Sequence, residues 1–533
     1  MNSLHLQRAF TTLLAAGVLA QPLAAGAQAA GDMTPPAQAL PSLGDAGDMT
    51  PLLERKLGDA IARELLRDAD YLDDAILGEY VDGIWHALLA GARARGELPA
   101  DLDEGFAWRV MLGRDATINA FALPGGYLGL HTALIGVVRT RDELASVLAH
   151  ELSHITQRHI ARMLGRQSRQ TPLIVAAILA GLVAGASNPQ AGTALVMGGQ
   201  AVGIQQQLNY SRDMEREADR IGLAIATQAG FRPEGFAAMF ETLQNAQRLM
   251  DNGDWPYLRS HPLTTQRIAD MRQREKINAP AVALPPDLQA LLMAARARVL
   301  SRPGVDTLHA WANAPDSANF ATLALPQRAA VLYAGALAQA QLRDLPKAER
   351  SAAALAGLVA SDASAARQAR LLQAELAILA GAPQRALQWL PAAASGGRGK
   401  AAAARDPQGS QQGRAELLLR AMAQTATGHA RDAATALQVW ISDHPLDAAA
   451  WQQLAAACNA QGQTLRALRA EGEAQVAQMD LQGAIDRFRA AQDHARQHPG
   501  NRADLIEASI IDARLRTVQE ALRQQKQDEA QLP

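Results

Sequence analysis

The sequence predicts a helix-rich α+β domain that contains a small antiparallel sheet, followed by an all-α domain of repeated helices. Three observations lead to this fold class. Alanine and leucine supply most of the apolar content while aromatic residues make up only 4% of the chain, and this composition favours helices. Strand-like segments are concentrated in residues 106–130. Beyond about residue 283, alanine-rich helical patterns follow one another to the end of the sequence.

The bulk composition excludes several functional classes. A chain of 533 residues is too long for a single core, and its length corresponds to about three or four domain-sized units. The formal net charge is −2 and the charged residues are interspersed, so there is no electrostatic footprint for nucleic acid. The single cysteine, Cys458, excludes an internal disulfide framework, and we expect it to be a buried side chain on a helix.

The first residues have the pattern of an export signal. Arg8 precedes an uncharged apolar stretch at 9–20, and the tripeptide Ala-Gln-Ala at 27–29 is a small-x-small cleavage site. We therefore expect a signal peptide at 1–29 and a flexible linker rich in proline and glycine at 30–50. The alternative is a retained amino-terminal anchor, but the apolar stretch is short for a bilayer span.

Residues 106–130 change from a helical to a strand-like pattern. Strand candidates at 108–112 and 127–130 flank a shorter extended piece at 118–122, and Pro-Gly-Gly at 124–126 signals a tight turn. In the small antiparallel sheet that we expect, an exposed edge can accept an extended peptide as an additional strand. The residues predicted to form this substrate edge are Asn119, Ala120 and Phe121.

A capped amphipathic helix follows the predicted sheet and carries the motif His-Glu-Leu-Ser-His at 150–154. Thr140 and Glu143 form a capping box, and apolar residues recur at helical spacing through the motif. His150 and His154 are four residues apart, which separates them by about 40° around a helix. Both can therefore bind the same metal ion.

Glu151 lies between the two histidines and has a different predicted role. It is turned by about 100° from His150 and cannot comfortably bind the same ion. It can instead act as the catalytic base, taking a proton from a metal-activated water that attacks a scissile carbonyl. The alternative is that His150 and His154 are hydrogen-bonded histidines on a surface helix, but the capped helix and the preceding sheet favour the metal site.

A catalytic zinc site requires a third protein ligand. The extended metzincin spacing is absent, because Gln157 stands at the required glycine and Ile160 at the third histidine. His159 comes one position too early and, on a continuous helix, lies on the wrong face. We therefore interpret His159 as a bystander.

Acidic residues further along the chain offer better candidates for the third ligand. Glu215 and Asp219 are four residues apart on another predicted helix, so one can bind the metal while the other accepts a hydrogen bond from a ligand histidine. Glu217 points elsewhere on that helix, and we expect it to be solvated. The spacing alone leaves the choice between Glu215 and Glu217 open.

Four motifs in this order resemble zinc metallopeptidase family 48, which includes HtpX and the CAAX prenyl proteases, and within it the BepA-like periplasmic branch. They are Asn-Ala-Phe-Ala-Leu-Pro-Gly-Gly at 119–126, His-Glu-x-x-His at 150–154, Glu-x-x-x-Asp at 215–219 and Ser-His-Pro at 260–262. The resemblance covers about residues 50–280. It implies a gluzincin-type metallopeptidase domain, to which we assign residues 51–282.

The resemblance also implies the roles of the site residues. One zinc ion per chain would be held by His150, His154 and Glu215, with Asp219 as the hydrogen-bond partner of a ligand. His261 would be a regulatory fourth ligand that can fill the open coordination position and hold the site inactive. The alternative is that His261 caps the helix that follows it.

Two other segments near the motifs have predicted roles. Arg267 can assist an oxyanion or form a structural salt bridge. Residues 172–204 are two uncharged apolar arms broken at Asn188-Pro189, and we expect a hairpin over the active-site cleft that contacts a membrane surface. The alternatives are a hairpin packed within the domain and a pair of membrane spans. Each arm has only about 14 residues, fewer than the roughly 20 that a span needs.

We expect residues 283–524 to form a tetratricopeptide-like repeat domain, followed by a polar tail at 525–533. Similar short segments recur along this region, and two of them begin at residues 431 and 465, a separation of 34 residues that matches a tetratricopeptide repeat. A Gly/Ala/Gln-rich insertion at 395–412 interrupts the pattern. Such repeats build a concave binding surface. The alternative is an irregular helical bundle.

Together the resemblance and the export signal imply a periplasmic, zinc-dependent endopeptidase that takes part in quality control or assembly of outer-membrane and other envelope proteins. Its substrates would be unfolded or stalled envelope proteins, and the repeat domain would contact the outer-membrane assembly machinery. The alternative is a chaperone or scaffold for envelope assembly with little proteolytic activity. The intact Glu151 favours catalysis.

Overall fold

The computed structural model describes residues 49–165, 212–249, 256–278, 287–390, 413–498 and 502–531, which all belong to one compact unit, Leu43–Pro533. The predicted signal peptide, apolar hairpin and Gly/Ala/Gln-rich insertion lie outside the described residues, as does nearly all of the predicted linker. These four segments therefore stay predictions. None of the described helices is long and apolar enough to cross a membrane.

Two capped helices open the described chain. α1 (Pro51–Arg67) begins after Thr50, whose hydroxyl accepts a backbone hydrogen bond from the first turn. α2 (Ala75–Arg95) begins after Asp74, which caps it in the same way, and it ends at Gly96 in the left-handed conformation. Local sequence signals thus set both ends of α2.

The next segment forms a small mixed sheet. Its strands are β1 (Tyr71–Leu72), β2 (Arg109–Gly113), β3 (Ala120–Leu123) and β4 (Tyr127–His131). The spatial order is β1-β2-β4-β3, with β2 and β4 parallel and the other two pairs antiparallel. The predicted strands are present, but the expectation of a purely antiparallel sheet is wrong. The chain reverses once before β3 and again at the short helix η1 (Pro124–Gly126), so β4 returns in the direction of β2.

Burial explains why β4, rather than β3, takes the place beside β2. Every residue of β4 is buried, whereas β3 carries small alanines and lies at the edge. The turn that connects them contains Gly125 and Gly126 with φ values of 72° and 86°, which glycine adopts without steric cost. The turn brings β4 back antiparallel to β3, and β3 forms one edge of the sheet.

The two faces of the sheet pack on different helices. Leu112, Leu128 and Leu130 belong to the core shared with α2 and α5 (Arg141–Thr156). Met111 and Tyr127 on the opposite face belong to the core shared with α1. Because strand side chains alternate between faces, each strand contributes to both cores.

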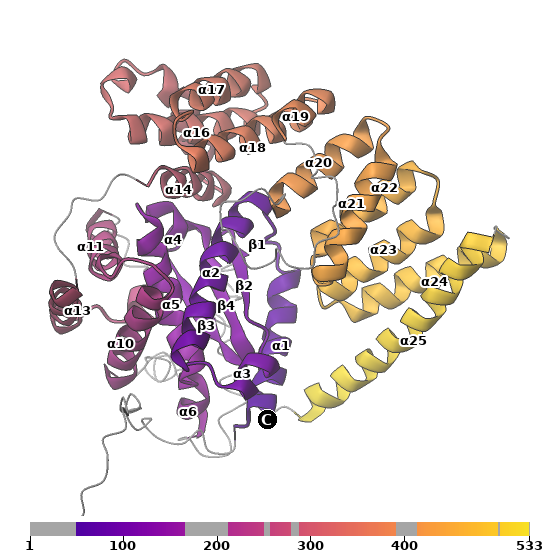
Figure 1. The fold of residues 1–533 in the computed structure, drawn as a ribbon, viewed down its shortest axis with the longest axis horizontal. Helices are drawn as coiled ribbons and strands as arrows, with labels where there is room; N and C mark the ends of the chain where they lie inside the picture. Colours follow the sequence, from indigo (N-terminus) through magenta and orange to yellow (C-terminus); the bar gives the residue numbers. More distant parts are fainter. Residues whose placement is uncertain are drawn as a thin grey trace, which may run out of the picture. The chain divides into compact units, whose positions relative to one another are not determined.

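α5 is the central helix of this part of the molecule. In Figure 1 it lies between α10 and the edge of the sheet, and it contacts α2, α10, α11 and β3. All its residues from Glu143 to Thr156 are buried. The other helices around it are α3 (Ala100–Gly105), α4 (Thr132–Val137), α6 (His159–Gly165), α10 (Arg212–Gln228), α11 (Glu234–Leu249), α12 (Pro256–Ser260) and α13 (Thr265–Asn278).

The remaining described chain is helical. It comprises α14 (Leu288–Leu300), α15 (Val305–Asn313), η2 (Ala314–Asp316), η3 (Phe320–Thr322), α16 (Leu325–Gln341), α17 (Leu345–Leu358), α18 (Ala363–Leu379), α19 (Pro383–Trp389), α20 (Arg414–Ala426), α21 (Ala430–Asp443), α22 (Ala448–Ala460), α23 (Thr464–Ala477), α24 (Leu481–Gln497) and α25 (Arg502–Gln531). From α15 to α25 each helix packs on the next. The expected all-α character is present among the described residues, and the tetratricopeptide assignment stays a prediction. Cys458 is buried in α22, as expected.

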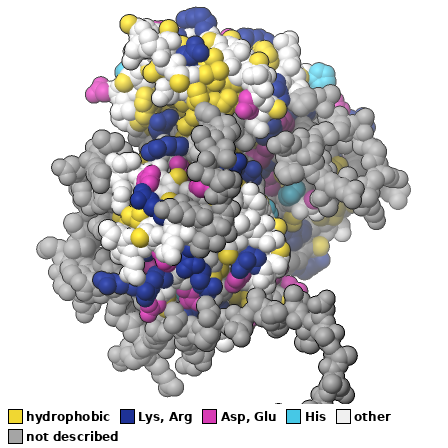
Figure 2. Space-filling model, turned by 60° about the vertical axis from the view of Figure 1, so that its left-hand side comes forward, with side chains coloured by type: hydrophobic (Ala, Val, Ile, Leu, Met, Phe, Trp, Pro, Cys, Tyr) yellow, Lys and Arg dark blue, Asp and Glu magenta, His cyan; other side chains and the backbone are white. Residues whose placement is uncertain are grey.

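The predicted polar tail at 525–533 is helical for most of its length, because α25 continues to Gln531. Two ion pairs hold this end on α1: Lys56 Nζ lies 2.9 Å from Asp528, and Arg63 Nη2 lies 2.7 Å from Glu529. The end of the described chain therefore contacts its beginning. On the face shown in Figure 2, basic and acidic side chains are mixed over the described surface.

The close contact between α5 and α10 depends on Gly222. A Cβ atom added at Gly222 would lie 3.0 Å from the carbonyl oxygen of Ala149 and 3.1 Å from the amide nitrogen of His150. This is closer than ordinary van der Waals contact, and both atoms belong to the backbone of α5. Glycine at this position therefore lets the two helices approach closely.

We predict opposite effects for the same substitution at two helical glycines. Gly83→Ala, on the exposed side of α2 with open space around it, should raise the free energy of unfolding by about 0.5–1 kcal/mol. Gly222→Ala should lower it by about 1 kcal/mol or more, because the helices must separate. Urea denaturation followed by circular dichroism measures both. Equal stabilisation of the two variants would show that the α5–α10 contact has room for a methyl group.

Candidate metal centre

α5 carries the central motif on a helix that is buried from Glu143 to Thr156. Thr140 Oγ1 accepts a hydrogen bond from the Glu143 amide at 3.1 Å, and the Glu143 carboxylate accepts one from the Arg139 amide at 2.7 Å. The predicted capped start of this helix is confirmed. The capping residues satisfy amides that would otherwise lack partners at the helix start.

Four of the predicted residues meet in one buried cluster formed by His150, His154, Glu215 and His261. The two Nε2 atoms of His150 and His154 are 3.1 Å apart, and Glu215 carboxylate oxygens lie 3.5 Å from each of them. His261 Nδ1 lies 3.3 Å from His150 Nε2 and 3.0 Å from Glu215 Oε1. The edge of a tetrahedron of zinc ligands is about 3.3 Å for bonds of about 2.0 Å, and these distances of 3.0–3.5 Å are close to it, so the group could hold one metal ion.

Glu151 lies beside the cluster with its carboxylate completely buried. Its Oε2 accepts a hydrogen bond from the Ala122 amide of β3 at 3.0 Å. Its Oε1 lies 3.4 Å from His261 Nε2 and accepts no hydrogen bond from the described residues. Burial raises the pKa of Glu151, which favours a carboxylate that readily takes up a proton.

Asp219 and Arg267 support the cluster from behind. Asp219 Oδ1 lies 3.0 Å from His150 Nδ1, which directs the Nε2 atom of that ring toward the other donors. Arg267 binds both oxygens of Asp219, at 2.6 and 2.7 Å. Its Nη1 lies 2.8 Å from Glu215 Oε2 and donates to the Pro262 carbonyl. All three guanidinium nitrogens therefore have a hydrogen-bond or ion-pair partner. Of the two roles predicted for Arg267, the structure shows the structural salt bridge.

The charges of these groups favour a divalent cation. Burial disfavours the ionised form of Asp219, but the hydrogen bonds from Arg267 and His150 outweigh it and lower the pKa of Asp219. Burial also disfavours the charged form of His150, yet Asp219 and Glu215 raise the pKa of its ring to about 9. When His150 is neutral, as metal binding requires, the three buried carboxylates of Glu151, Glu215 and Asp219 outnumber the one guanidinium by two charges. A divalent ion held by the cluster would balance them.

Comparison with known proteins agrees with this geometry. The sequence profile of peptidase family M48 matches residues 90–275, a range that contains the whole cluster. These residues form a peptidase family M48 domain. The resemblance inferred from four sequence motifs is thereby confirmed, and M48 peptidases use a divalent metal, typically zinc.

Three relatives of known name are also similar to this chain in sequence. A provisionally named beta-barrel assembly-enhancing protease of Vibrio cholerae serotype O1 is 36% identical over 315 residues, which cover 58% of this chain and 62% of the relative. The beta-barrel assembly-enhancing protease of Escherichia coli K12 is 33% identical over 248 residues, 46% of this chain and 49% of the relative. Mitochondrial metalloendopeptidase OMA1 of Saccharomyces cerevisiae is 28% identical over 196 residues, 36% of this chain and 54% of the relative. The chain thus matches less than two thirds of each relative's length.

His261 takes part in the cluster of the M48 domain and does not cap α13. The hydroxyl of Thr264 accepts a hydrogen bond from the Arg267 amide at 3.2 Å, so Thr264 caps that helix. The alternative interpretation of His261 as a cap is therefore wrong. His261 follows α12, and its ring packs against Tyr257 one turn earlier with ring centroids 4.9 Å apart.

Two residues that we interpreted as uninvolved lie against the cluster. His159 is fully buried, and its Nδ1 lies 2.7 Å from His154 Nδ1. Its Nε2 lies 3.1 Å from a Glu217 oxygen that Arg162 also contacts at 3.2 Å. Both the bystander role of His159 and the solvated state of Glu217, whose side chain is only 12% exposed, are therefore wrong.

A break in the helix explains the error. On a continuous helix His159 would be turned by about 140° from His154. α5 instead ends at Thr156, Arg158 has a φ of 51°, and a new helix, α6, begins at His159. The helical period therefore does not extend to His159. No glycine or proline marks this break in the sequence.

The predicted substrate edge lies beside the cluster. Ala120 and Phe121 belong to β3, the edge strand, and Asn119 precedes it, with its carbonyl accepting a hydrogen bond from the His131 amide of β4. The amide of Ala122 points the other way, toward Glu151. The edge strand and the catalytic helix are thus joined by a direct hydrogen bond.

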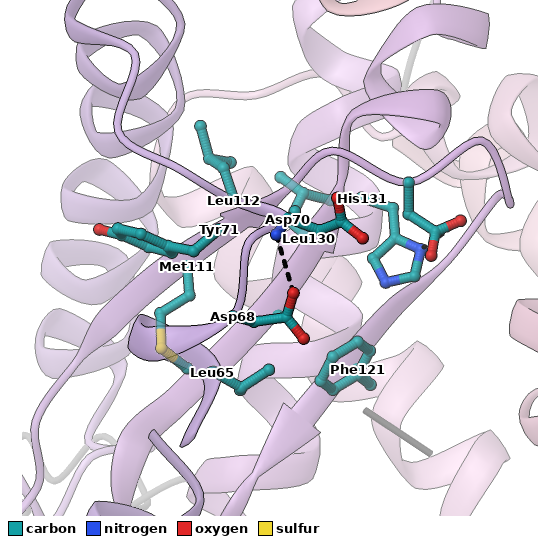
Figure 3. Close-up of a pocket in the computed structure, with 12 residues that line it drawn as sticks. Leu65, Asp68, Asp70, Tyr71, Met111, Leu112, Phe121, Leu130 and His131 are labelled. Atoms are coloured by element: carbon teal, nitrogen blue, oxygen red, sulfur yellow. Dashed lines mark hydrogen bonds and ion pairs between the residues drawn. The ribbon is translucent and has the colours of Figure 1, made fainter. Parts of the chain in front are cut away.

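A small pocket of about 50 Å³ lies on the α1 side of the sheet (Figure 3). Phe121 and His131 line it, with ring centroids 5.8 Å apart and edge to face, and Asp68 accepts a hydrogen bond from the Asp70 amide within it. None of the four cluster residues lines this pocket. It is therefore separate from the metal centre.

We predict that Arg267→Lys lowers the free energy of unfolding by about 3 kcal/mol or more, because a lysine cannot bind both oxygens of Asp219 and leaves buried charge without a partner. Arg272→Lys on the same helix is the matched control. Its ion pair with Glu241 is about half exposed, and its loss should cost less than about 1 kcal/mol. Urea denaturation measures both. Similar small losses for the two variants would contradict a structural role for the Arg267 fork.

Proposed function

We propose that this chain is an exported zinc-dependent endopeptidase that acts in the periplasm on unfolded or stalled envelope proteins, in quality control or assembly of outer-membrane proteins. The observation that carries the proposal is the buried cluster of His150, His154, Glu215 and His261 with Glu151 beside it. The names of the beta-barrel assembly-enhancing relatives support the substrate class. The pattern at 1–29 supports export.

The donor set favours zinc over other divalent ions. Three imidazole nitrogens and one carboxylate at tetrahedral distances suit zinc, whereas magnesium and calcium prefer six or more oxygen ligands. In the roles that we assign, His150, His154 and Glu215 hold the ion, Asp219 orients His150, and His261 is the replaceable fourth ligand. A bound zinc ion supplies Lewis-acid polarisation of the scissile carbonyl and of the attacking water.

Glu151 is the group that we assign to proton transfer. The Ala122 amide fixes one of its oxygens and leaves Oε1 directed toward His261. That oxygen takes the proton of the attacking water and passes it to the leaving amine nitrogen. Because burial raises the pKa of Glu151, its carboxylate takes up a proton more readily than that of an exposed glutamate.

β3 is the strand that we assign to substrate binding. Backbone groups in an antiparallel pair point alternately toward and away from the partner strand. Asn119 pairs with β4 and Ala122 points toward α5, so the outer side of β3 faces the metal centre. An unfolded peptide that pairs with this edge has its backbone beside Glu151, and such pairing recognises extended chains with little regard to sequence.

The first test separates metal binding from catalysis. The purified protein should contain about one zinc ion per chain, and Glu151→Gln should retain it while casein hydrolysis falls by about 10²-fold or more. His150→Ala, His154→Ala and Glu215→Ala should each lose the metal, measured by elemental analysis after gel filtration. A wild type that binds no zinc and cleaves nothing would contradict the peptidase proposal. Full activity of Glu151→Gln would contradict the role of the base.

The second test addresses His261 as a latch. His261→Ala should hydrolyse casein faster, by about tenfold if roughly nine in ten wild-type molecules are closed, because an open position admits water and substrate. Thr264→Ala is the control, since it removes the cap of α13 without touching the cluster. A rate that is unchanged or lower in a folded, zinc-loaded His261→Ala protein would contradict the latch. A similar increase in Thr264→Ala would attribute the effect to loosening of α13.

A further inference from the structure

A continuous chain of hydrogen-bonding groups runs from one of the cluster histidines to the surface of α10. His154 Nδ1 lies 2.7 Å from His159 Nδ1, and His159 Nε2 lies 3.1 Å from Glu217 Oε2. Arg162 donates to the same oxygen from two nitrogens, each at 3.2 Å. The two histidines are fully buried, and Arg162 is nearly so.

The chemistry of the two imidazoles allows only one arrangement of protons when His154 binds a metal. His154 must present the lone pair of Nε2 to the ion, so its proton is on Nδ1. His159 must then accept at Nδ1 and carry its own proton on Nε2. That proton points at Glu217, whose negative charge is held in place by Arg162. The chain is therefore directional, from His154 through His159 to Glu217.

The two histidines on α5 are thus supported in different ways. His150 Nδ1 meets the carboxylate of Asp219 directly, at 3.0 Å. His154 reaches the carboxylate of Glu217 only through the ring of His159. Hydrogen bonds of this kind fix the orientation of a ligand ring and increase its basicity. The acidic residues that end both chains, Glu217 and Asp219, lie on α10 with the ligand Glu215.

The break between α5 and α6 makes this contact possible. Arg158 holds the left-handed conformation at the break, and its side chain binds the buried carboxylate of Glu54 on α1 at 2.9 Å. A residue other than glycine in this conformation costs of order 1 kcal/mol or more. The neighbouring contacts therefore maintain a backbone conformation that directs His159 toward His154.

We propose that His159 and Glu217 are positioning residues for the metal ligand His154, and that they set the affinity of the centre for its ion. This inference rests on the proposed function as a zinc enzyme. Neither residue touches the reacting atoms. Their effect acts through the orientation and basicity of one ligand ring.

The test compares two replacements of His159 in the full chain. His159→Leu keeps most of the volume but offers no acceptor, and should raise the Kd for zinc, measured by chelator competition, by about 10–100-fold. His159→Asn places an oxygen where Nδ1 was and should raise the Kd by less than about tenfold. The visible absorption of the cobalt-substituted protein should shift in the leucine variant, because the ligand field changes, and less in the asparagine variant.

Two controls separate positioning from general damage. His131→Leu removes another buried histidine, on β4 and outside the cluster, and should leave the zinc Kd within about twofold of wild type, since no ligand contact is lost. Glu217→Gln keeps the ring of His159 and removes only the charge, so it should weaken zinc binding less than His159→Leu does. This variant serves as the test if His159→Leu fails to fold.

The outcomes distinguish this inference from the proposed function. A wild type without measurable zinc affinity contradicts the proposed function itself. Tight zinc binding by the wild type together with an unchanged Kd in both His159→Leu and Glu217→Gln overturns the positioning role alone. Equal losses in His159→Leu and His131→Leu also overturn it, because they would reflect general destabilisation.

Discussion

The metal centre depends on compensation of buried charge, and Arg267 is the fixed part of that compensation. Glu151, Glu215 and Asp219 are at most 2% exposed, and uncompensated carboxylates at such positions cost several kcal/mol each. The Arg267 guanidinium binds both oxygens of Asp219 and lies 2.8 Å from Glu215. A divalent ion held by the cluster would contribute the remaining two positive charges. Fold stability and metal binding are therefore coupled in this part of the chain.

The same groups require two helices and a strand to meet within a few ångströms. Gly222 lets α10 approach the backbone of α5, which places Glu215 opposite the two histidines. The hydrogen bond from Ala122 to Glu151 ties the edge strand to α5 on its other side. Close packing is thus a precondition of the chemistry, because a shift of about 1 Å in either contact would open the tetrahedron of donors.

The parts of this arrangement that follow from local sequence could be predicted. The helical period places His150 and His154 together, and the capping residues locate the start of α5. Spacing alone does not identify the third metal ligand as Glu215 or Glu217, because both carboxylates lie near the cluster. Glu215 faces the rings of His150, His154 and His261, whereas Glu217 faces the ring of His159. His159 was misplaced because the break at Arg158 is held by Glu54, about a hundred residues earlier in the chain. The parallel pairing of β2 and β4 is likewise not predicted from the sequence. The turn at Pro124–Gly126 indicates only that β3 and β4 are antiparallel, whereas the position of β4 beside β2 goes with the burial of all its residues.

His261 differs from the other two histidines of the cluster in what its second ring nitrogen faces. The Nδ1 atoms of His150 and His154 meet Asp219 and His159, which are supporting groups. His261 uses Nδ1 toward the cluster, and its Nε2 lies 3.4 Å from Glu151, the proposed base. In the proposed site, one ring would therefore occupy a coordination position and cover the carboxylate oxygen at the same time. Movement of this ring would free the coordination position and the Glu151 oxygen together. In the proposed mechanism, water therefore reaches the ion only when His261 no longer blocks the base.

The short helix α12, which directly precedes His261, has five residues, whereas α5 and α10 have sixteen and seventeen. A ligand that must leave is better placed on the shorter element, because fewer packed contacts have to break when it moves.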